Sequence, residues 1–130
     1  MGTSTIPNTR TVVEQYYAYA NEGAWDAWCD LFTEDQVMDE QLAGHVEGRE
    51  TLRAMMAGFP ATYTRFANVP RYVVVEGGQA AVVSHISALT KAGEGIEADV
   101  CNFFRVTADG LISYMSNFHD SVPFAPVLGK

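Results

Sequence analysis

The stretch from Val100 to Asp120 has the pattern of a long β-hairpin. Two apolar-rich runs flank a turn that contains Asp109-Gly110, and an Asp-Gly pair between such runs is a strong hairpin signal. Side chains alternate between the two faces of a strand, so each run has one inward face. These faces are mostly apolar but carry polar residues at the end far from the turn. In a strand that only closes a core, polar side chains on the inward face would be buried without a function. The pattern therefore predicts a strand pair that lines a pocket. The inward positions include Val100, Asn102, Met115, Asn117 and His119.

The composition is that of one globular domain. At 130 residues the chain has the length of a single domain, which we expect to cover residues 1–130. Hydrophobic residues make up 48% and charged residues 18%, which fits a packed core rather than disorder. The net charge of −8 argues against nucleic acid and anionic membranes as partners, because phosphate binding needs a basic patch. No apolar run approaches membrane-spanning length.

The sequence indicates neither a metal site nor a cofactor. Cys29 and Cys101 belong to no CxxC or Cys/His cluster, so no zinc site is predicted. No P-loop, dinucleotide fingerprint or HExxH motif is found. We interpret both cysteines as small core residues. Free thiols in a chain without a secretory signal favour a cytoplasmic location.

Three helices are expected before the β-rich part of the chain. They cover about residues 8–21, 24–32 and 48–59, where apolar residues recur with helical spacing. Core packing is the usual role of such stripes. Because methionine is adaptable, the third helix is also expected to wall an apolar ligand site with Met55 and Phe59.

Residues 36–47 have the pattern of a first hairpin or bent strand. Met38 and Glu40 share one face of it, whereas Asp39 lies on the other. If the Met38 face points inward, Glu40 is a carboxylate in an apolar setting and suits the role of a base near neutral pH. The alternative is that both acids lie at a solvated strand end. The pattern leaves open which of the two faces the interior.

The rest of the chain is β-rich. Runs at residues 63–76 and 79–90 are separated by Gly77-Gly78, and together with the opening hairpin they predict a meander of long antiparallel strands. Pro70 predicts a bulge or an irregular entry to its strand. The tail from residue 121 has two prolines and cannot extend the sheet regularly. We expect it to fold over a sheet edge or a pocket mouth, or to reach a partner subunit.

This order of elements resembles the nuclear transport factor 2-like superfamily, and within it the SnoaL-like and ketosteroid-isomerase-like proteins. The resemblance is carried by YYAYANEGAWDAWCDLFTED, GHVEGRETL and FFRVTADGLISYMSNFHD, and it covers nearly the whole chain. It implies an α+β fold, a cone-shaped α+β barrel in which three N-terminal helices pack on a strongly curved, mostly antiparallel sheet. A deep apolar pocket lies between these layers in the family. Members often form dimers, so a homodimer is expected.

The comparison with ketosteroid isomerase implies roles for three residues. Tyr16 matches the oxyanion tyrosine of that enzyme. Glu40 matches its catalytic base, which is an aspartate there, and Asn102 matches a protonated aspartate that is the second oxyanion donor. The glutamate moves the carboxylate outward by one methylene, and the amide is a weaker donor. These departures argue against steroid isomerisation itself and leave proton abstraction next to a carbonyl as the expected chemistry.

The comparison with SnoaL-like cyclases concerns residues of the last predicted strand. Their catalytic aspartate matches Asn117, which cannot serve as a base. His119 shares the Asn117 face, and histidine as a residue type is suited to acid–base chemistry near neutral pH, so it is a second candidate base. The substrate-binding residues expected from this comparison, from strand parity and from the methionine-bearing stripe of the third helix are Asn117, Met115, Met38, Phe59, Met55, Ser84, Ile86 and Val100.

Three functions fit these observations. The first is a cofactor-independent isomerase or cyclase that acts on a small hydrophobic, carbonyl-bearing substrate of polyketide, terpenoid or steroid type. Glu40 or His119 takes a proton from carbon, and Tyr16 with Asn102 stabilises the enolate oxygen. The second is a dehydratase, epoxide hydrolase or epoxide-opening cyclase, in which Glu40 or Asp39 activates water or removes a proton. The third is a non-catalytic ligand-binding or dimerisation module.

Overall fold

The computed structural model describes residues 7–128, which form four α-helices, six β-strands and one 3₁₀ helix. The helices are α1 (Thr9–Glu22), α2 (Trp25–Cys29), α3 (Arg49–Ala57), α4 (Phe59–Thr62) and the 3₁₀ helix η1 (Val122–Val127). The strands are β1 (Phe32–Glu40), β2 (Gly44–Glu47), β3 (Tyr63–Glu76), β4 (Gln79–Thr90), β5 (Gly95–Val106) and β6 (Ile112–Phe118).

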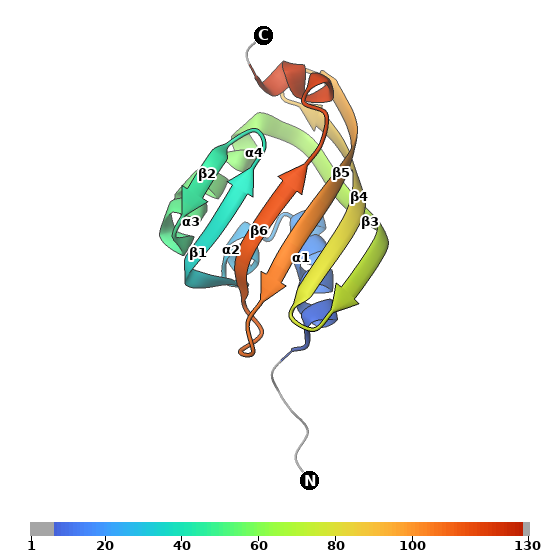
Figure 1. The fold of residues 1–130 in the computed structure, drawn as a ribbon. Helices are drawn as coiled ribbons and strands as arrows, with labels where there is room; N and C mark the ends of the chain where they lie inside the picture. Colours follow the sequence, from blue (N-terminus) through green and yellow to red (C-terminus); the bar gives the residue numbers. More distant parts are fainter. Residues whose placement is uncertain (1–6, 129–130) are drawn as a thin grey trace.

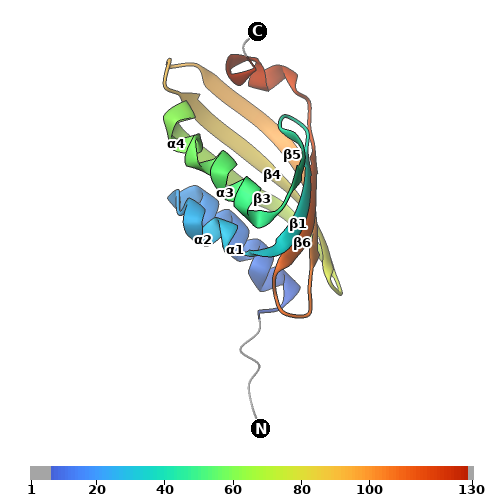
Figure 2. The same cartoon turned by 90° about the vertical axis from the view of Figure 1, so that its left-hand side faces the viewer.

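The strands form one curled sheet in the order β2-β1-β6-β5-β4-β3 (Figure 1). Neighbouring strands are antiparallel except for β1 and β6, which run parallel. The α-helices all lie on one face of this sheet, which stays open with β2 and β3 at its edges (Figure 2). The expected α+β cone, with helices packed on a strongly curved and mostly antiparallel sheet, is therefore confirmed.

The alternation of side chains along β5 separates a buried face from an outer face. Every second residue from Ile96 to Val106 is buried against the helices, and most residues between them are exposed. Cys101 falls on the outer face and is exposed, so its interpretation as a core residue was wrong, whereas Cys29 is buried. The irregularity expected at Pro70 is present as a shift in the β3–β4 register directly after that residue.

The helices differ in length from the sequence expectation. The second helix is shorter than predicted, because Phe32 already pairs with Ile112 as the start of β1. The third predicted helix is split at Gly58 into α3 and α4. Pro60 stands in the first turn of α4 rather than ending the preceding helix. The backbone N–H groups of the first helical turn have no acceptor within the helix. A proline, which lacks this N–H, can therefore stand at the start of a helix.

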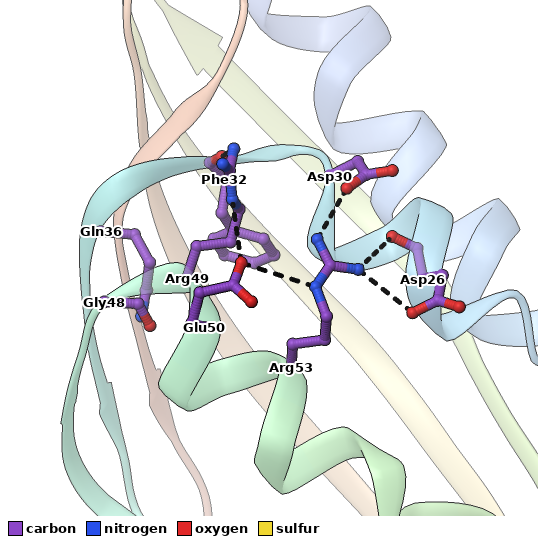
Figure 3. Close-up of polar contacts among 8 residues, drawn as sticks. All are labelled: Asp26, Asp30, Phe32, Gln36, Gly48, Arg49, Glu50 and Arg53. Carbon is purple, nitrogen blue, oxygen red and sulfur yellow. Dashed lines mark hydrogen bonds and ion pairs between the residues drawn. The ribbon is translucent and has the colours of Figure 1, made fainter.

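Polar contacts hold α2, α3 and β1 together (Figure 3). Arg53 on α3 reaches the carboxylates of Asp26 (3.1 Å) and Asp30 (2.8 Å) at α2. Arg49 donates to the backbone carbonyl of Phe32 at 3.3 Å, at the start of β1. These contacts fix the two helices that contribute tryptophan and methionine side chains to the cavity described below.

The core has two parts. The larger part packs α1 and α2 against β1, β5 and β6 and includes fully buried Val12, Tyr17 and Phe104. The smaller part surrounds Ile96 and Phe124 at the other end of β5. Within residues 7–128 no helix is long and apolar enough to cross a membrane.

Candidate active site

One cavity of about 260 Å³ lies between the helices and the curled sheet. Its walls are mostly apolar and aromatic, and a few polar side chains enter it from different elements. This combination is the usual form of a small-molecule site. The polar members of the lining are Tyr16, Glu40, Tyr63, Asn68, Asn102, Asn117 and His119. The other members are Ala20, Trp25, Trp28, Met38, Leu42, Ala43, Leu52, Met55, Met56, Phe59, Phe66, Ile86, Val100, Met115 and Phe124.

Most of the side chains predicted from the sequence meet in this cavity, although they come from seven helices and strands and from the segment after β6. The residues from the candidate set that line it are Tyr16, Glu40, Asn102, His119, Asn117, Met115, Met38, Phe59, Met55, Ile86 and Val100. Two candidates do not line it, Asp39 and Ser84.

Asp39 lies on the outer face of the sheet, away from the cavity. Its carboxylate contacts the His45 ring at 2.6 Å and accepts a hydrogen bond from the Tyr114 hydroxyl at 2.7 Å. The hydrogen bond from His45, and then that from Tyr114, lower the pKa of Asp39. Glu40 is therefore the acid that faces the cavity, as expected if the Met38 face of the strand points inward. This geometry does not support a catalytic role for Asp39.

Tyr16 lines the cavity from α1. The ring packs against Trp28 and Phe104, with centroids 5.3 and 5.0 Å away, so the side chain is held on both sides. Burial raises the pKa of Tyr16 well above its ordinary value, and the Tyr17 hydroxyl and the Glu40 carboxylate raise it further. The hydroxyl therefore stays protonated at neutral pH and remains a hydrogen-bond donor.

Glu40 ends β1 with its carboxylate fixed at the cavity wall. The Oε2 atom accepts hydrogen bonds from the backbone N–H groups of Leu42 (2.9 Å) and Ala43, which begin the turn to β2. The Oε1 atom accepts a hydrogen bond from the Asn117 amide at 3.2 Å, across the parallel β1–β6 pair. A carboxylate offers about four lone-pair positions. One position thus remains free on a carboxylate whose orientation is already set.

Asn102 belongs to a closed polar cluster at the buried end of the cavity. Its amide Nδ2 donates to the Tyr17 hydroxyl at 2.8 Å and to the Ser84 hydroxyl at 3.1 Å. Both amide hydrogens are therefore engaged, and neither is free for a substrate oxygen. Ser84 is fully buried beneath this amide, which explains why it faces inward without lining the cavity.

Removing the Asn102 amide is expected to destabilise the fold. In the Asn102→Ala variant the Tyr17 and Ser84 hydroxyls lose their buried partner, and an unpaired buried polar group costs about 1–3 kcal/mol. Urea denaturation of this variant, of Tyr17→Phe and of the double variant measures the effect. We expect the loss in the double variant to be smaller than the sum of the single losses. Strictly additive losses would contradict the cluster.

The C-terminal segment closes the far end of the cavity. Phe124 of η1 is buried and packs on the His119 ring at a centroid distance of 4.6 Å. The Nδ1 atom of His119 contacts the backbone carbonyl of Asp120 at 2.9 Å. Of the alternatives for the tail, folding over the pocket mouth is the one that the structure shows.

Several lining residues were not predicted from the sequence. The α2 stripe that contains Trp25 and Trp28 was assigned to core packing, although both rings border the cavity. The Trp28 Nε1 atom is buried and has no hydrogen-bond partner among residues 7–128. Asn68 was missed because the register shift after Pro70 hides the inward parity of the first half of β3. In residues 7–128 no group of three His, Cys, Asp or Glu side chains is placed to hold a metal ion.

A comparison with protein-family models identifies the family. The model described as SnoaL-like domain matches residues 13–115, which include most of α1, all of α2 to α4, strands β1 to β5 and most of the cavity lining. The chain belongs to the SnoaL-like family. A search of curated protein sequences finds no significant match to this SnoaL-like chain.

Solved structures with the same fold are described with different functions or with none. A candidate polyketide cyclase from Pseudomonas putida KT2440 is 21% identical, with a TM-score of 0.82 and coverage of 91% of this chain and 96% of that one. An NTF2-like protein of unknown function from Burkholderia pseudomallei K96243 is 12% identical, with a TM-score of 0.84 and coverage of 95% and 99%. SalBIII, an epoxide hydrolase/cyclase-like enzyme in salinomycin pyran ring formation, is 22% identical, with a TM-score of 0.76 and coverage of 86% and 90%. At these identities the likeness establishes the fold of this SnoaL-like chain and leaves the reaction to its own residues.

Proposed function

We propose that this protein is a cofactor-independent enzyme that removes a proton from carbon next to a carbonyl group of a small hydrophobic substrate. The observation that carries the proposal is the pair formed by Glu40 and Tyr16. A fixed carboxylate and a protonated, buried hydroxyl face one apolar cavity from different elements. A base and an oxyanion donor are the two groups that enolate chemistry needs.

In the proposed step, the free lone pair of Glu40 takes the proton from the carbon. The electron pair of the broken C–H bond forms the enolate double bond, and the negative charge moves to the carbonyl oxygen. The Tyr16 hydroxyl donates a hydrogen bond to that oxygen. Glu40 then returns the proton, either to a different carbon, which gives an isomerase, or to the oxygen of a second carbonyl that the enolate carbon attacks, which gives a cyclase.

Asn102 has a supporting role in this proposal. Because its amide hydrogens are engaged by Tyr17 and Ser84, it acts as a positioning residue that holds the Tyr17 side chain beside Tyr16. The two adjacent tyrosine rings lie edge to face at 4.8 Å, so a shift of one displaces the other. This replaces the donor role that the resemblance to ketosteroid isomerase implied for Asn102.

Hydrogen–deuterium exchange at an activated carbon tests the proposal without knowledge of the natural substrate. The probe is 2-tetralone, a bicyclic ketone whose C1 hydrogens lie between a carbonyl and an aromatic ring. Incubation with the protein in D₂O, followed by proton NMR, is expected to show exchange at C1 faster than in buffer alone. Inhibition by 2-naphthol, which resembles the enol, is expected as well. Exchange at the buffer rate would count against the proposal.

Epoxide opening is a second candidate, favoured by the same neutral hydroxyl. Tyr16 keeps its proton at neutral pH, so it can donate a hydrogen bond to an epoxide oxygen while Glu40 activates water or an internal hydroxyl. The resemblance to SalBIII points in the same direction. Solvent oxygen labelled with ¹⁸O enters the product of hydrolysis and is absent from the product of isomerisation.

We also propose a homodimer in the cytoplasm. Large apolar side chains on the outer side of the sheet support self-association, because a monomer rarely leaves such side chains grouped in water. Tyr72 and Val74 on β3 are 68% and 66% exposed, and Phe118 at the end of β6 is 61% exposed. Analytical ultracentrifugation decides between monomer and dimer.

A further inference from the structure

Gln41 lies directly after Glu40, in the turn between β1 and β2, and the proposed chemistry does not use it. Its side chain is exposed, yet it forms two hydrogen bonds with the backbone of His119. The Oε1 atom accepts from the His119 N–H at 2.9 Å, and the Nε2 atom donates to the His119 carbonyl. One side chain therefore bridges two segments that are 78 residues apart in the sequence.

This contact replaces strand pairing at the point where the sheet ends. The backbone pairing of β6 with β1 ends at Ser116, and its pairing with β5 ends at Phe118. His119 follows directly and still carries a backbone donor and a backbone acceptor. An amide side chain offers one group of each kind, as the backbone of a neighbouring strand does. Gln41 therefore holds the segment after β6 in the way that a further strand residue would.

The backbone of Gln41 is linked to the Glu40 carboxylate through Asn117. The Gln41 N–H donates to Asn117 Oδ1 at 2.9 Å, and Asn117 Nδ2 donates to Glu40 Oε1 at 3.2 Å. A backbone N–H can only donate, so it fixes which end of the Asn117 amide is the oxygen. The NH₂ end must then face the carboxylate. The place of Gln41 in the turn thus determines how Asn117 meets Glu40.

The same turn supplies the remaining donors to this carboxylate. The N–H groups of Leu42 and Ala43, the next two residues, donate to Glu40 Oε2. A shift of the turn at Gln41 therefore displaces every hydrogen bond that orients the carboxylate. A misplacement of about 1 Å can lower an enzymatic rate by about 10²-fold.

The segment that Gln41 holds is the one that closes the cavity. The His119 ring packs on Phe124 of η1 at a centroid distance of 4.6 Å, and both residues line the cavity. The Asp120 carboxylate accepts from the N–H of Val122, the first residue of η1, at 2.9 Å. Because Phe124 is buried, the cavity can open at this end only if η1 moves.

We propose that Gln41 is a positioning residue that couples the closure of η1 over the cavity to the orientation of the Glu40 carboxylate. With η1 closed, the backbone of His119 lies within reach of the Gln41 amide, and the turn holds the donors of Glu40 in place. With η1 open, this contact is lost and the turn is free to shift. The inference rests on the proposed function for the role of Glu40 and adds its link to the C-terminal segment.

Amide hydrogen exchange of the free protein, read by NMR, tests the link without a ligand. The reporters are the turn N–H groups of Leu42 and Ala43 and the N–H groups of η1. Phe124→Ala loosens η1, and we expect exchange about tenfold faster at both places, as the loss of about one hydrogen bond predicts. Phe124→Leu serves the same purpose if the alanine variant folds poorly.

The Gln41→Met variant keeps the length of the side chain without its amide. In this background the Phe124 substitutions should still speed exchange in η1, but they should change exchange at the turn by less than about twofold, because independent sites do not couple. The proposal is overturned if the turn does not respond to the Phe124 substitutions in the wild type, or if it responds equally in both backgrounds.

Exchange at C1 of 2-tetralone gives the catalytic reading. We expect Gln41→Met to slow it by about tenfold, as misplacement of the base predicts. The double variant Gln41→Met/Phe124→Ala should be at most about twofold slower than the slower single variant, because both changes break one linkage. The control is Gln79→Met, at an exposed glutamine that begins β4, with an expected rate within about twofold of the wild type.

Single-variant losses that multiply in the double variant would also overturn the proposal, as would a Gln41→Met rate equal to that of the wild type while Glu40→Gln is slow. Failure of the proposed chemistry looks different. In that case the wild type exchanges 2-tetralone at the buffer rate, and the amide exchange of the turn and of η1 alone decides whether Gln41 links them.

Discussion

Replacing Glu40 with glutamine is expected to slow C1 exchange of 2-tetralone by about 10² to 10⁴-fold, the usual contribution of a positioned general base. Glutamine keeps the size of the side chain and still offers an oxygen to the N–H groups of Leu42 and Ala43. It lacks the negative charge that takes a proton from carbon. The loss should therefore appear in the rate rather than in the binding of 2-naphthol.

The matched control for this change is Glu34→Gln. Glu34 lies on the same strand and is exposed, so its substitution removes the same charge without touching the cavity. We expect its exchange rate to stay within about twofold of the wild type, since surface substitutions of this kind have small effects. A Glu40→Gln rate within tenfold of wild type would reject Glu40 as the base. If His119→Gln then abolished exchange, His119 would hold that role.

Replacing Tyr16 with phenylalanine is expected to slow the same exchange by about 10² to 10³-fold, the effect of losing one oxyanion donor. The ring packing against Trp28 and Phe104 is kept, because the change removes the hydroxyl alone. The hydroxyl has a raised pKa because of burial, and it therefore acts as a donor throughout the neutral range. The exchange rate should show no titration of Tyr16 between pH 6 and 9, the range over which it is measured.

The control for the tyrosine is Tyr72→Phe. Tyr72 is 68% exposed on the outer side of β3, so removing its hydroxyl leaves the cavity unchanged. A melting temperature for Tyr16→Phe close to that of the wild type would show that the lower rate comes from the donor. Exchange that survives in Tyr16→Phe at the wild-type rate would mean that another group stabilises the oxygen.

Strand parity was the most reliable guide to the site. Because side chains alternate with a period of two, the inward positions of the opening hairpin could be read directly, and Asn102, Met115 and Asn117 do line the cavity. The same rule gave Glu40 and Asp39 opposite faces, which the structure shows. Parity gave no prediction for Asn68, because the register shift after Pro70 breaks the count along β3.

Other features depend on neighbours that are distant in the chain. The amide of Asn102 was expected to be free, but Tyr17 on α1 and Ser84 on β4 occupy both of its hydrogens. The fixed orientation of Glu40 depends on Asn117 from a parallel strand 77 residues away. No local pattern encodes such pairs, because they follow from how the helices pack on the curled sheet.

The central claim is that an enolate forms between Glu40 and Tyr16, and a crystal structure of the 2-naphthol complex tests it most directly. The account predicts the naphthol oxygen within about 2.7–3.1 Å of the Tyr16 hydroxyl, the range for a donor placed on a developing oxyanion. It also predicts that C1, the carbon that loses its proton in 2-tetralone, faces the Glu40 carboxylate. A naphthol bound in the cavity with its oxygen away from Tyr16 and its C1 away from Glu40 would contradict the account.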